Sequence, residues 1–415
     1  MKTWKKVRLE DICRIEMGKT PSRDDSTYWG EGTAWLSIAD MKQKFTSTSK
    51  ETITSKAAQN CNCRLVKPGT LLMSFKLSIG KLTFNTVPLY TNEAIVALPI
   101  IDETQVSKYY LYYALQSINL TEGTDKAAKG LTLNKEKLKN IKIPLPPLAE
   151  QIHIAQVMDQ TDRLRQQDRQ LLAHYDQLVQ AVFVDMFGSA NPESKDWAEV
   201  KIAELAKPTK NSMRTGPFGS DLLHSEFVEE GIFVLGIDNV VNNCFEWAKP
   251  RFITTEKYEK LKRYTVFPGD VLISIMATIG RTAVVPEDVP AAINSKHLAA
   301  ISLNQDLAVP EFISYSLYAD PKILRQLASQ SKGAIMDGLN LGIIKNTKLN
   351  LPPLKLQRKF TTILAAIEAQ KAVVKQLQLQ SEALFNSLLQ QAFRGELTRP
   401  EPAELAAAGQ LRFAL

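Results

Sequence analysis

One stretch of this chain occurs twice and decides its fold. It reads Lys67-Pro-Gly-Thr-Leu-Leu-Met-Ser-Phe-Lys-Leu-Ser-Ile-Gly80-Lys81 at its first occurrence and Phe267-Pro-Gly-Asp-Val-Leu-Ile-Ser-Ile-Met-Ala-Thr-Ile-Gly280-Arg281 at its second. Similar pairs flank it in the same order, Trp4-Lys-Lys-Val-Arg-Leu with Trp197-Ala-Glu-Val-Lys-Ile and Leu145-Pro-Pro-Leu148 with Leu351-Pro-Pro-Leu354. The offset drifts from 193 to 206 residues, as expected when insertions accumulate in surface loops. The sequence therefore predicts two similar modules that arose by duplication.

The composition is that of an ordinary globular protein. The 415 residues are 44% hydrophobic and 23% charged, and the length suggests two or three domains. No run approaches the 18 apolar residues of a membrane span, and no apolar segment typical of a secretory signal follows Met1. The four cysteines form no disulfide framework and no Cys-x-x-Cys pattern. We therefore expect a cytoplasmic protein with reduced thiols and no metal, although Cys61-Asn-Cys63 is a weak metal hint.

The positive charge is concentrated in the first module. The net charge of the chain is +7, and residues 1–145 carry 22 Lys and Arg against 14 Asp and Glu. Residues 189–350 carry 18 basic residues against 19 acidic ones. A basic module suits a polyanion such as nucleic acid, since Lys and Arg contacts to phosphate supply most non-specific affinity. Phosphate contacts in the second module would need a local patch.

Each module begins with a mixed α/β region. Short strands are predicted in Gly69–Phe75 and Gly269–Ile275, because both follow a Pro-Gly turn signal. Amphipathic helices are predicted at Val106–Gln116 and Pro310–Ala319. We interpret each region as one α/β domain.

Each module ends in a long helix. The helices start after Pro-Pro, at Leu148 and Leu354, and run without Pro or Gly to Gly188 and Gly395. Apolar residues follow an alternating three–four spacing at 360, 363, 367, 374, 377, 384 and 388, and at 164, 171, 175, 178 and 182. This spacing predicts a coiled-coil seam, with Asp168, Gln370 and Ser381 as polar interruptions. Rods of about 60 Å would most simply pair antiparallel with a module at each end; alternatively, each helix folds back on its own module.

No catalytic constellation stands out. Gly18-Lys19-Thr20 lacks the earlier glycine of a phosphate-binding loop, since that position holds Cys13, and a turn after a strand explains it better. Asn350-Leu-Pro-Pro-Leu354 lacks the aromatic residue of an amino-group methyltransferase motif. The chain has only four histidines, and His297 is a better candidate for a polar contact than for a catalytic base. We expect no catalytic residues and no metal ligands.

Several motifs together resemble those of one known protein family. Ile143-Pro-Leu-Pro-Pro-Leu-Ala-Glu-Gln151 resembles the family's domain-to-helix junction, and Leu351-Pro-Pro-Leu-Lys-Leu-Gln357 repeats it with Leu356 in place of the usual acid. Phe183-Val-Asp-Met-Phe-Gly188 and Gln391-Ala-Phe-Arg-Gly-Glu-Leu-Thr398 resemble the ends of its two conserved helical regions. Thr215-Gly-Pro-Phe-Gly-Ser220 resembles a common opening of its recognition domains. This family is the specificity subunits of Type I restriction–modification systems, and the likeness covers essentially the whole chain.

The resemblance implies an α/β (α+β) fold with two target recognition domains, residues 1–147 and 189–353. Two antiparallel coiled-coil helices, residues 148–188 and 354–397, would join them with pseudo-two-fold symmetry, followed by a tail at 398–415. The resemblance also implies a non-catalytic subunit in which each domain reads one half of a bipartite, asymmetric DNA site and the helices set the spacer. The implied partners are double-stranded DNA, two methyltransferase subunits and nuclease–translocase subunits. S-adenosylmethionine, ATP and Mg would act in those partners, and none in this chain.

Polar residues after strands or on loops are the candidate DNA contacts, because Arg and Lys can bind guanine or phosphate and Asn can bind adenine. The candidates are Lys19, Ser22, Arg23, Lys76, Lys81, Lys129, Thr132, Arg214, Ser220, Asn239, Arg281, His297 and Lys332. For each of them a solvated surface role remains open. So do three other functions for the chain: a protein-interaction scaffold without DNA, an enzyme with an unrecognised active site, and the specificity subunit of a complex that only methylates. The target bases, the spacer length and the stoichiometry are not encoded in any readable pattern.

Overall fold

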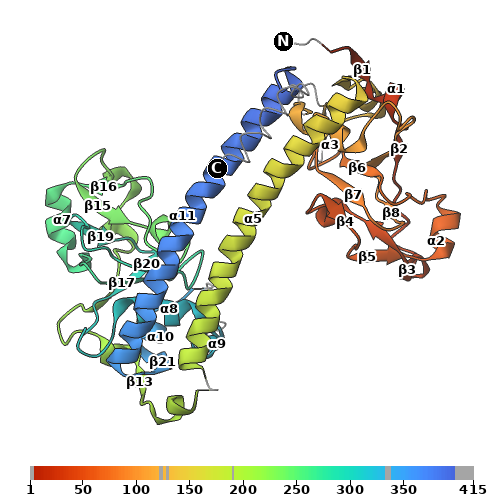
Figure 1. The fold of residues 1–415 in the computed structure, drawn as a ribbon. Helices are drawn as coiled ribbons and strands as arrows, with labels where there is room; N and C mark the ends of the chain where they lie inside the picture. Colours follow the sequence, from red (N-terminus) through yellow and green to blue (C-terminus); the bar gives the residue numbers. More distant parts are fainter. Residues whose placement is uncertain (1–3, 121–124, 128–129, 189–190, 332–337, 398–415) are drawn as a thin grey trace, which may run out of the picture. The chain divides into compact units, whose positions relative to one another are not determined.

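The computed structural model describes residues 4–120, 125–127, 130–188, 191–331 and 338–397. The chain divides into two compact units, each built around one mixed α/β domain (Figure 1). Unit 1 comprises Met1–Arg169 and Gln376–Leu415, and unit 2 comprises Gln170–Lys375. The two longest helices, α5 (Leu148–Phe187) and α11 (Leu354–Phe393), contribute one half each to both units. No helix in these ranges is long and apolar enough to cross a membrane.

The domain of unit 1 contains a five-stranded sheet in the order β2-β9-β6-β7-β4 and a three-stranded sheet in the order β5-β3-β8. The five strands are β2 (Glu16–Met17), β9 (Ile95–Leu98), β6 (Leu71–Ser74), β7 (Leu82–Asn85) and β4 (Phe45–Thr46). The strands of the three-stranded sheet are β5 (Glu51–Ile53), β3 (Trp29–Leu36) and β8 (Tyr90–Thr91). Two further pairs of short strands are antiparallel: β1 (Lys6–Arg8) with β12 (Lys142–Pro144), and β10 (Asp125–Ala127) with β11 (Gly130–Thr132). The helices are α1 (Leu9–Ile12), α2 (Ser55–Asn60), α3 (Lys108–Ser117) and α4 (Lys135–Lys139), with 3₁₀ turns η1 (Ser26–Tyr28) and η2 (Ile38–Asp40).

The domain of unit 2 repeats this plan with a four-stranded sheet, β14-β20-β17-β18, and a three-stranded sheet, β16-β15-β19. Its strands are β13 (Glu199–Lys201), β14 (Met213–Thr215), β15 (Ile232–Leu235), β16 (Phe252–Ile253), β17 (Val271–Ser274), β18 (Thr282–Val284), β19 (Ala292–Asn294), β20 (Leu298–Ile301) and β21 (Lys348–Asn350). Its helices are α6 (Ile202–Leu205), α7 (Thr255–Leu261), α8 (Pro310–Ala319), α9 (Pro321–Ser331) and α10 (Leu341–Asn346). Its 3₁₀ turns are η3 (Pro192–Asp196), η4 (Gly219–Asp221), η5 (His224–Glu226), η6 (Ile237–Asn239) and η7 (Lys262–Tyr264).

The repeated stretch forms the central hairpin of each larger sheet. β6 pairs antiparallel with β7 and β9, and β17 pairs antiparallel with β18 and β20. Every residue of β6 and β17 is buried, as expected for strands covered on both faces. The predicted strands and the helices α3 and α8 are therefore confirmed, and α8 matches its predicted range, Pro310–Ala319.

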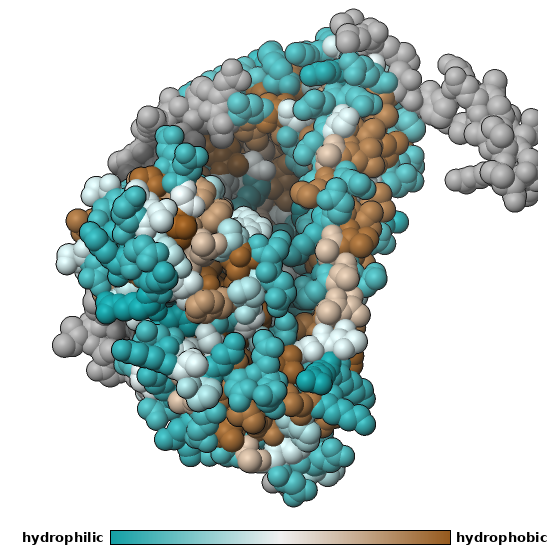
Figure 2. Space-filling view, turned by 90° about the vertical axis from the view of Figure 1, so that its left-hand side faces the viewer, coloured by the Kyte–Doolittle hydropathy of each residue, from teal (hydrophilic) through white to brown (hydrophobic). Residues whose placement is uncertain are grey.

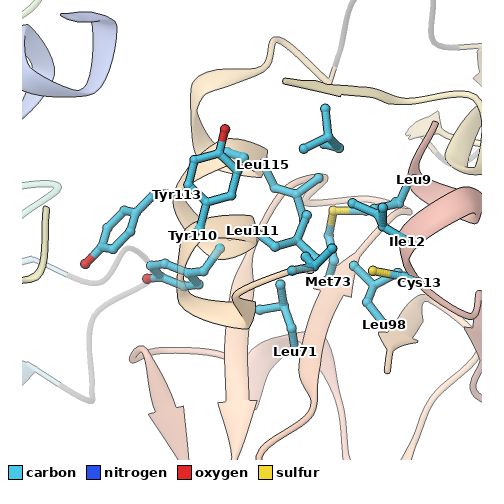
Figure 3. Close-up of a cluster of buried hydrophobic side chains, with 14 of the residues drawn as sticks. Leu9, Ile12, Cys13, Leu71, Met73, Leu98, Tyr110, Leu111, Tyr113 and Leu115 are labelled. Atoms are coloured by element: carbon cyan, nitrogen blue, oxygen red, sulfur yellow. The ribbon is translucent and has the colours of Figure 1, made fainter. Parts of the chain in front are cut away.

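The hydrophobic core of unit 1 lies between its sheet and α3. Leu71, Met73 and Leu98 of the sheet meet Tyr110 and Leu111 of α3 (Figure 3). Ile154 and Met158 of α5 and Phe385 and Ala392 of α11 belong to the same core. In unit 2 the corresponding helix residues are Val179, Phe183, Phe360 and Ile367. Each helix half is thus part of a domain core as well as half of an antiparallel helix pair.

The predicted seam between the long helices is partly wrong. Phe360, Ile367, Val374 and Ser381 form one buried column at seven-residue spacing on α11. Leu164, Leu171 and Leu178 of α5, predicted to lie in the seam, are 47%, 40% and 46% exposed, and Leu377 and Leu384 of α11 are exposed as well. The reason is that the buried faces of the helices are shared with the domain cores, so a second column of leucines is left facing outward.

Candidate nucleic-acid interface

The repeated stretch ends in a loop that has the same backbone in both domains. Ser74 Oγ accepts a hydrogen bond from Lys81 N (3.0 Å) and donates one to Ser78 O. Ser274 Oγ likewise accepts from Arg281 N (2.9 Å) and donates to Thr278 O. Leu77 and Ala277 both adopt positive φ, at 62° and 60°, a conformation that is uncommon for residues with a Cβ atom. The serine of each domain therefore stabilises a loop with a strained backbone. This loop consists of the residues between Ser74 and Lys81 in the first domain and between Ser274 and Arg281 in the second.

Two further segments meet this loop at the same place in each domain. Phe75 N donates to Ala94 O (2.9 Å), and Ile275 N donates to His297 O (2.8 Å). Gly18 N donates to Ile95 O and Gly216 N to Leu298 O. These bonds align the segment 91–94 with 294–297, and Gly18 with Gly216. We call this arrangement the corner: residues 17–23, 37–40, 76–81 and 91–94 in the first domain, and 215–220, 236–239, 276–281 and 294–297 in the second.

Glycine is required where the corner segments cross. A Cβ atom on Gly18 would lie 2.2 Å from Asn92 O, and one on Gly216 would lie 2.2 Å from the carbonyl carbon of Ser295. Both distances are far below a van der Waals contact, and both neighbours are backbone atoms that cannot swing aside. Gly18 follows β2 directly, so the Gly18-Lys19-Thr20 stretch is explained by this close approach of two chain segments.

The two corners share a backbone but carry different side chains. Lys76 in the first corner corresponds to Met276 in the second, Glu93 to Lys296, and Ala94 to His297. The same backbone arrangement therefore presents side chains of different chemistry in the two domains.

The candidate residues of the first domain that the structure describes lie on its surface. Lys81 is exposed on the loop, with Nζ 3.5 Å from Ile38 O, and Lys76 of the same loop is partly exposed. Lys19 and Ser22 are exposed on the segment after β2. Arg23 lies there too, with its guanidinium 3.7 Å from the centre of the Trp29 ring and 2.9 Å from Glu51 Oε2.

Two of the candidate DNA contacts are not among the residues that the structure describes. Lys129 and Lys332 lie beyond the described residues. Thr132 ends β11, but its side chain is not described. In the second domain, Ser220 and Arg281 are exposed and His297 is partly buried.

Two candidates of the second domain are corrected, because their side chains are used inside the protein. The Arg214 side chain is 5% exposed and forms an ion pair with Asp270. It also donates to Thr265 O (2.8 Å) and Ser302 Oγ (3.0 Å), so all three of its guanidinium nitrogens are bonded inside the protein. Asn239 is buried; its Oδ1 accepts from Gly236 N and its Nδ2 donates to Glu246 O, both at 2.9 Å.

Asn239 has a counterpart in the first domain that shows its role. Asp40 Oδ2 accepts from Ser37 N at 2.9 Å, the same bond across a 3₁₀ turn. Both side chains stabilise the turn after the first long strand of the small sheet. The sequence could not distinguish this role from base contact, because both roles use a polar residue just after a strand.

Sequence reasoning missed the residues that gather around His297. Arg251, Lys296 and His224 line the same pocket as His297. Burial lowers the pKa of His297, and the charges of Lys296 and Arg251 lower it further. The position of Lys296 next to His297 was a usable signal. Arg251 and His224 come from distant segments, and nothing in their local sequence points to the pocket.

The described part of the chain holds no group of three or more His, Cys, Asp or Glu that could bind a metal ion. Cys61 and Cys63 are free, partly buried thiols, and burial raises the pKa of Cys63.

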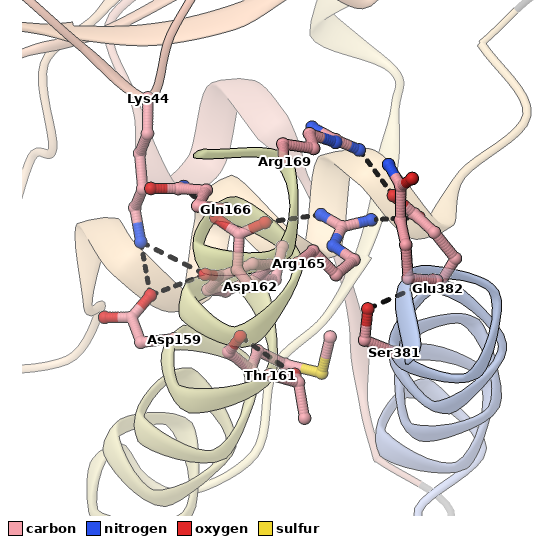
Figure 4. Close-up of polar contacts among 12 residues, drawn as sticks. Lys44, Asp159, Thr161, Asp162, Arg165, Gln166, Arg169, Ser381 and Glu382 are labelled. Carbon is pink, nitrogen blue, oxygen red and sulfur yellow. Dashed lines mark hydrogen bonds and ion pairs between the residues drawn. The ribbon is translucent and has the colours of Figure 1, made fainter. Parts of the chain in front are cut away.

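The long helices are tied together by charged and polar contacts within each unit. In unit 1, Arg165 and Arg169 of α5 converge on Glu382 of α11 (Figure 4), and Ser381 Oγ donates to Asp168 Oδ2 at 2.7 Å. Burial alone would raise the pKa of Glu382, but the hydrogen bonds and charges of the two arginines outweigh it and lower that pKa. In unit 2, Lys371 Nζ lies 2.8 Å from Asp176 Oδ1. Two of the three polar interruptions, Asp168 and Ser381, are therefore partners across the helix pair.

Comparison with known proteins agrees with this architecture. The model of a family described as "Type I restriction modification DNA specificity domain" matches residues 1–173 and 194–382. The specificity subunit of the Type I restriction enzyme EcoBI of Escherichia coli is 24% identical, covering 97% of this chain and 88% of the relative. The MjaIX specificity subunit of Methanocaldococcus jannaschii is 25% identical, covering 95% of this chain and 94% of the relative.

Solved structures show the same fold. The S subunit of a Type I restriction–modification system from M. genitalium matches with a TM-score of 0.55 at 15% identity, covering 94% of this chain and 96% of that one. A chain from a study of complex assembly and conformational transition of the type I R-M system matches with a TM-score of 0.57 at 17% identity, covering 96% and 99%.

Proposed function

The chain belongs to the Type I restriction modification DNA specificity domain family, and from that membership we propose that it is the DNA sequence-recognition subunit of such a system. Each domain reads one half of a bipartite, asymmetric DNA site. The observation that carries this proposal is the corner, which is built twice from the same backbone and presents different side chains each time. A protein that recognised one ligand in one way would not need two copies of the corner with different exposed side chains.

The exposed corner residues have the chemistry of DNA recognition. Lys76, Lys81 and Arg281 can bond the acceptor edge of guanine or hold phosphate. Lys19, Ser22 and Arg23 in the first domain and Ser220 in the second lie on segments of the same corners. Lys129, Thr132 and Lys332 remain predicted contacts on the sequence alone.

The long helices act as the spacer of the bipartite site. Each has 40 residues, which at 1.5 Å per residue gives a rod of about 60 Å. One turn of DNA is about 34 Å long, so two recognition domains held by helices of this length can contact separate segments of the major groove. The contacts of Glu382 with Arg165 and Arg169 fix the register of the pair in unit 1.

The outward leucines of the helices are the docking surface for partner subunits. Leu164, Leu171 and Leu178 lie seven residues apart on α5, and Leu377 and Leu384 repeat the spacing on α11. Figure 2 shows hydrophobic side chains, in brown, at the surface along the long helices. Rows of exposed leucine at this spacing are unusual on a protein that works alone. In the proposal they bind two methyltransferase subunits.

The chemistry of the complex belongs to the partners. S-adenosylmethionine serves the methyltransferase subunits, and ATP and Mg²⁺ serve nuclease–translocase subunits, so this chain acts without catalysis or cofactor. Because its ligand is DNA, the proposal places it in the cytoplasm.

The test is co-expression of the chain with the methyltransferase subunits of the same restriction–modification system, followed by mapping of methylated adenine or cytosine across the host DNA. Two short motifs at one fixed separation support the proposal. A single uninterrupted motif would argue against a reader with two modules. No methylation, together with no salt-sensitive binding to duplex DNA, would favour the scaffold alternative. Cleavage assays with the nuclease subunits then separate a restricting complex from one that only methylates.

A further inference from the structure

A pocket of about 280 Å³ opens in the second domain beside its corner. One part of its wall is apolar and includes Phe227 and Val234. The other part carries four basic side chains, His224, Arg251, Lys296 and His297, together with Ser295. These five residues come from η5, from the segment before β16 and from the segment between β19 and β20. None of the described residues that line the pocket is acidic.

Two polar atoms of the residues that line this pocket have no partner within the described structure. Ser295 Oγ and Arg251 Nε are both buried and have no hydrogen-bond partner. Arg251 forms one ion pair, from Nη2 to Asp238 Oδ1, which leaves Nε free. Buried polar groups are nearly always bonded, so these two unpaired atoms, in residues that line one basic pocket, point to a partner that the described protein does not supply.

We propose that this pocket binds a single phosphate group of the DNA backbone, a site that rests on the DNA-reading function proposed above. A phosphate offers only acceptor oxygens and negative charge, and the pocket offers donors and positive charge. Arginine, lysine, a serine hydroxyl and imidazole N–H groups are the donors that commonly hold phosphate in protein–DNA contacts. The carboxylate of Asp238 is paired with Arg251.

The first domain has no such site at the same corner. Glu93 stands at the position of Lys296 and is bonded to Thr20 Oγ1, and Ala94 stands at the position of His297. This difference matches the charge of the two domains. Residues 1–145 have a net charge of +8, so many of their surface lysines can attract the backbone, whereas residues 189–350 have a net charge of −1. The second domain needs a local cluster of donors to hold phosphate, and this pocket is that cluster.

The first test measures duplex binding by the full chain, assembled with its methyltransferase subunits, for wild type, Lys296→Gln and His297→Gln. In Lys296→Gln the lost phosphate contact should weaken binding about eightfold at about 0.1 M salt and reduce the slope of log K against log salt by about 0.9. In His297→Gln binding should weaken with the slope unchanged, because an imidazole with a lowered pKa contributes a hydrogen bond and no charge. The loss should be equal for a cognate and an unrelated duplex, because a phosphate carries no base identity. Lys355→Gln, which removes the same charge from an exposed lysine of α11, is the matched control and should change neither value.

A second measurement locates the phosphate. Uncharged methylphosphonate groups are placed one at a time along the half-site read by the second domain. Wild type should lose affinity at one position, and Lys296→Gln should be indifferent to substitution at that position. A loss confined to the cognate duplex would show base reading instead, and unchanged affinity and salt slope in both variants would show that the pocket does not meet DNA; either result overturns the proposal. Failure of the wild-type complex to bind duplex DNA at all would instead overturn the proposed function.

Discussion

The side-chain oxygen of Gln151 accepts a hydrogen bond from the backbone N–H of Ser107, 2.9 Å away, and so joins the start of α5 to the start of α3. Its amide nitrogen donates to Gln105 O and Pro146 O, both at 2.8 Å. Gln357 makes the same set of bonds at the start of α11, accepting from Val309 N at 2.8 Å. Both glutamines are fully buried. The repeated Pro-Pro-Leu-x-x-Gln junction is therefore the joint that fixes each long helix to its domain.

Removing this joint should destabilise the protein. Gln151→Met keeps the side-chain volume but leaves one buried N–H and two carbonyls without partners, which should cost about 2–4 kcal/mol of unfolding free energy. Denaturant unfolding of the purified chain measures it. Gln167→Met, at an exposed position of α5, is the control and should stay within about 0.5 kcal/mol. A similarly small effect at Gln151 would mean that the joint does not hold the helix.

The Glu382 contacts predict a pH dependence of stability. The arginines lower the pKa of Glu382 in the folded protein. A lowered folded-state pKa stabilises the fold at pH values above the unfolded pKa of about 4.3, and this stabilisation disappears as the pH falls through the folded value. In Glu382→Gln the unfolding free energy should therefore fall less between pH 6 and pH 3 than in wild type. If the unfolding free energies of the two proteins fell by the same amount between pH 6 and pH 3, this account would be contradicted.

Arg214 should matter for stability and not for DNA sequence choice. Arg214→Met leaves Asp270 buried without its partner, which should cost about 3–5 kcal/mol. The double variant Arg214→Met, Asp270→Asn should recover part of this loss, because the orphaned charge is removed. Unfolding experiments measure both, and methylation mapping with the double variant should return the wild-type motif. A changed half-site would show that Arg214 contacts bases after all.

The outward leucines should govern assembly. Leu171→Gln and Leu178→Gln change exposed positions, so each should alter unfolding free energy by only about 0.5 kcal/mol. Burial of a leucine in an interface is worth about 1.5–3 kcal/mol, so each change should weaken methyltransferase binding about tenfold or more. Titration of the methyltransferase subunit onto the purified chain measures this, with Gln177→Ala of the same helix as control. Equal affinity for all variants would place the docking surface elsewhere.

The spacer role predicts the effect of longer helices. One heptad is inserted between Arg169 and Gln170 of α5 and another between Lys375 and Gln376 of α11, where the chain passes from one unit to the other. Seven residues add about 10 Å of helix, which corresponds to about three base pairs of DNA. Methylation mapping should return the same two half-sites with a gap about three base pairs longer. An unchanged gap, or changed half-sites, would rule out the helices as the ruler.

The sequence was enough to predict the elements that depend on local pattern. The duplication, the hairpin strands after Pro-Gly, α3 and α8, and the starts of α5 and α11 after Pro-Pro were all readable, because turn residues and periodicity act over a few positions. The Asp168 and Ser381 interruptions were also visible, although their meaning as partners was not.

Only the tertiary structure decided which side chains are buried and which face solvent. Leu164 and Leu171 satisfy a seam pattern but lie outside it, because the domain cores cover another face of the helix. Arg214 looks like a DNA contact until Asp270, 56 residues away, is seen beside it. Arg251 and His297 meet in one pocket from segments 46 residues apart. Local sequence determines what a segment can form, whereas burial and pairing arise from contacts between distant segments, so no stretch of this chain encodes them alone.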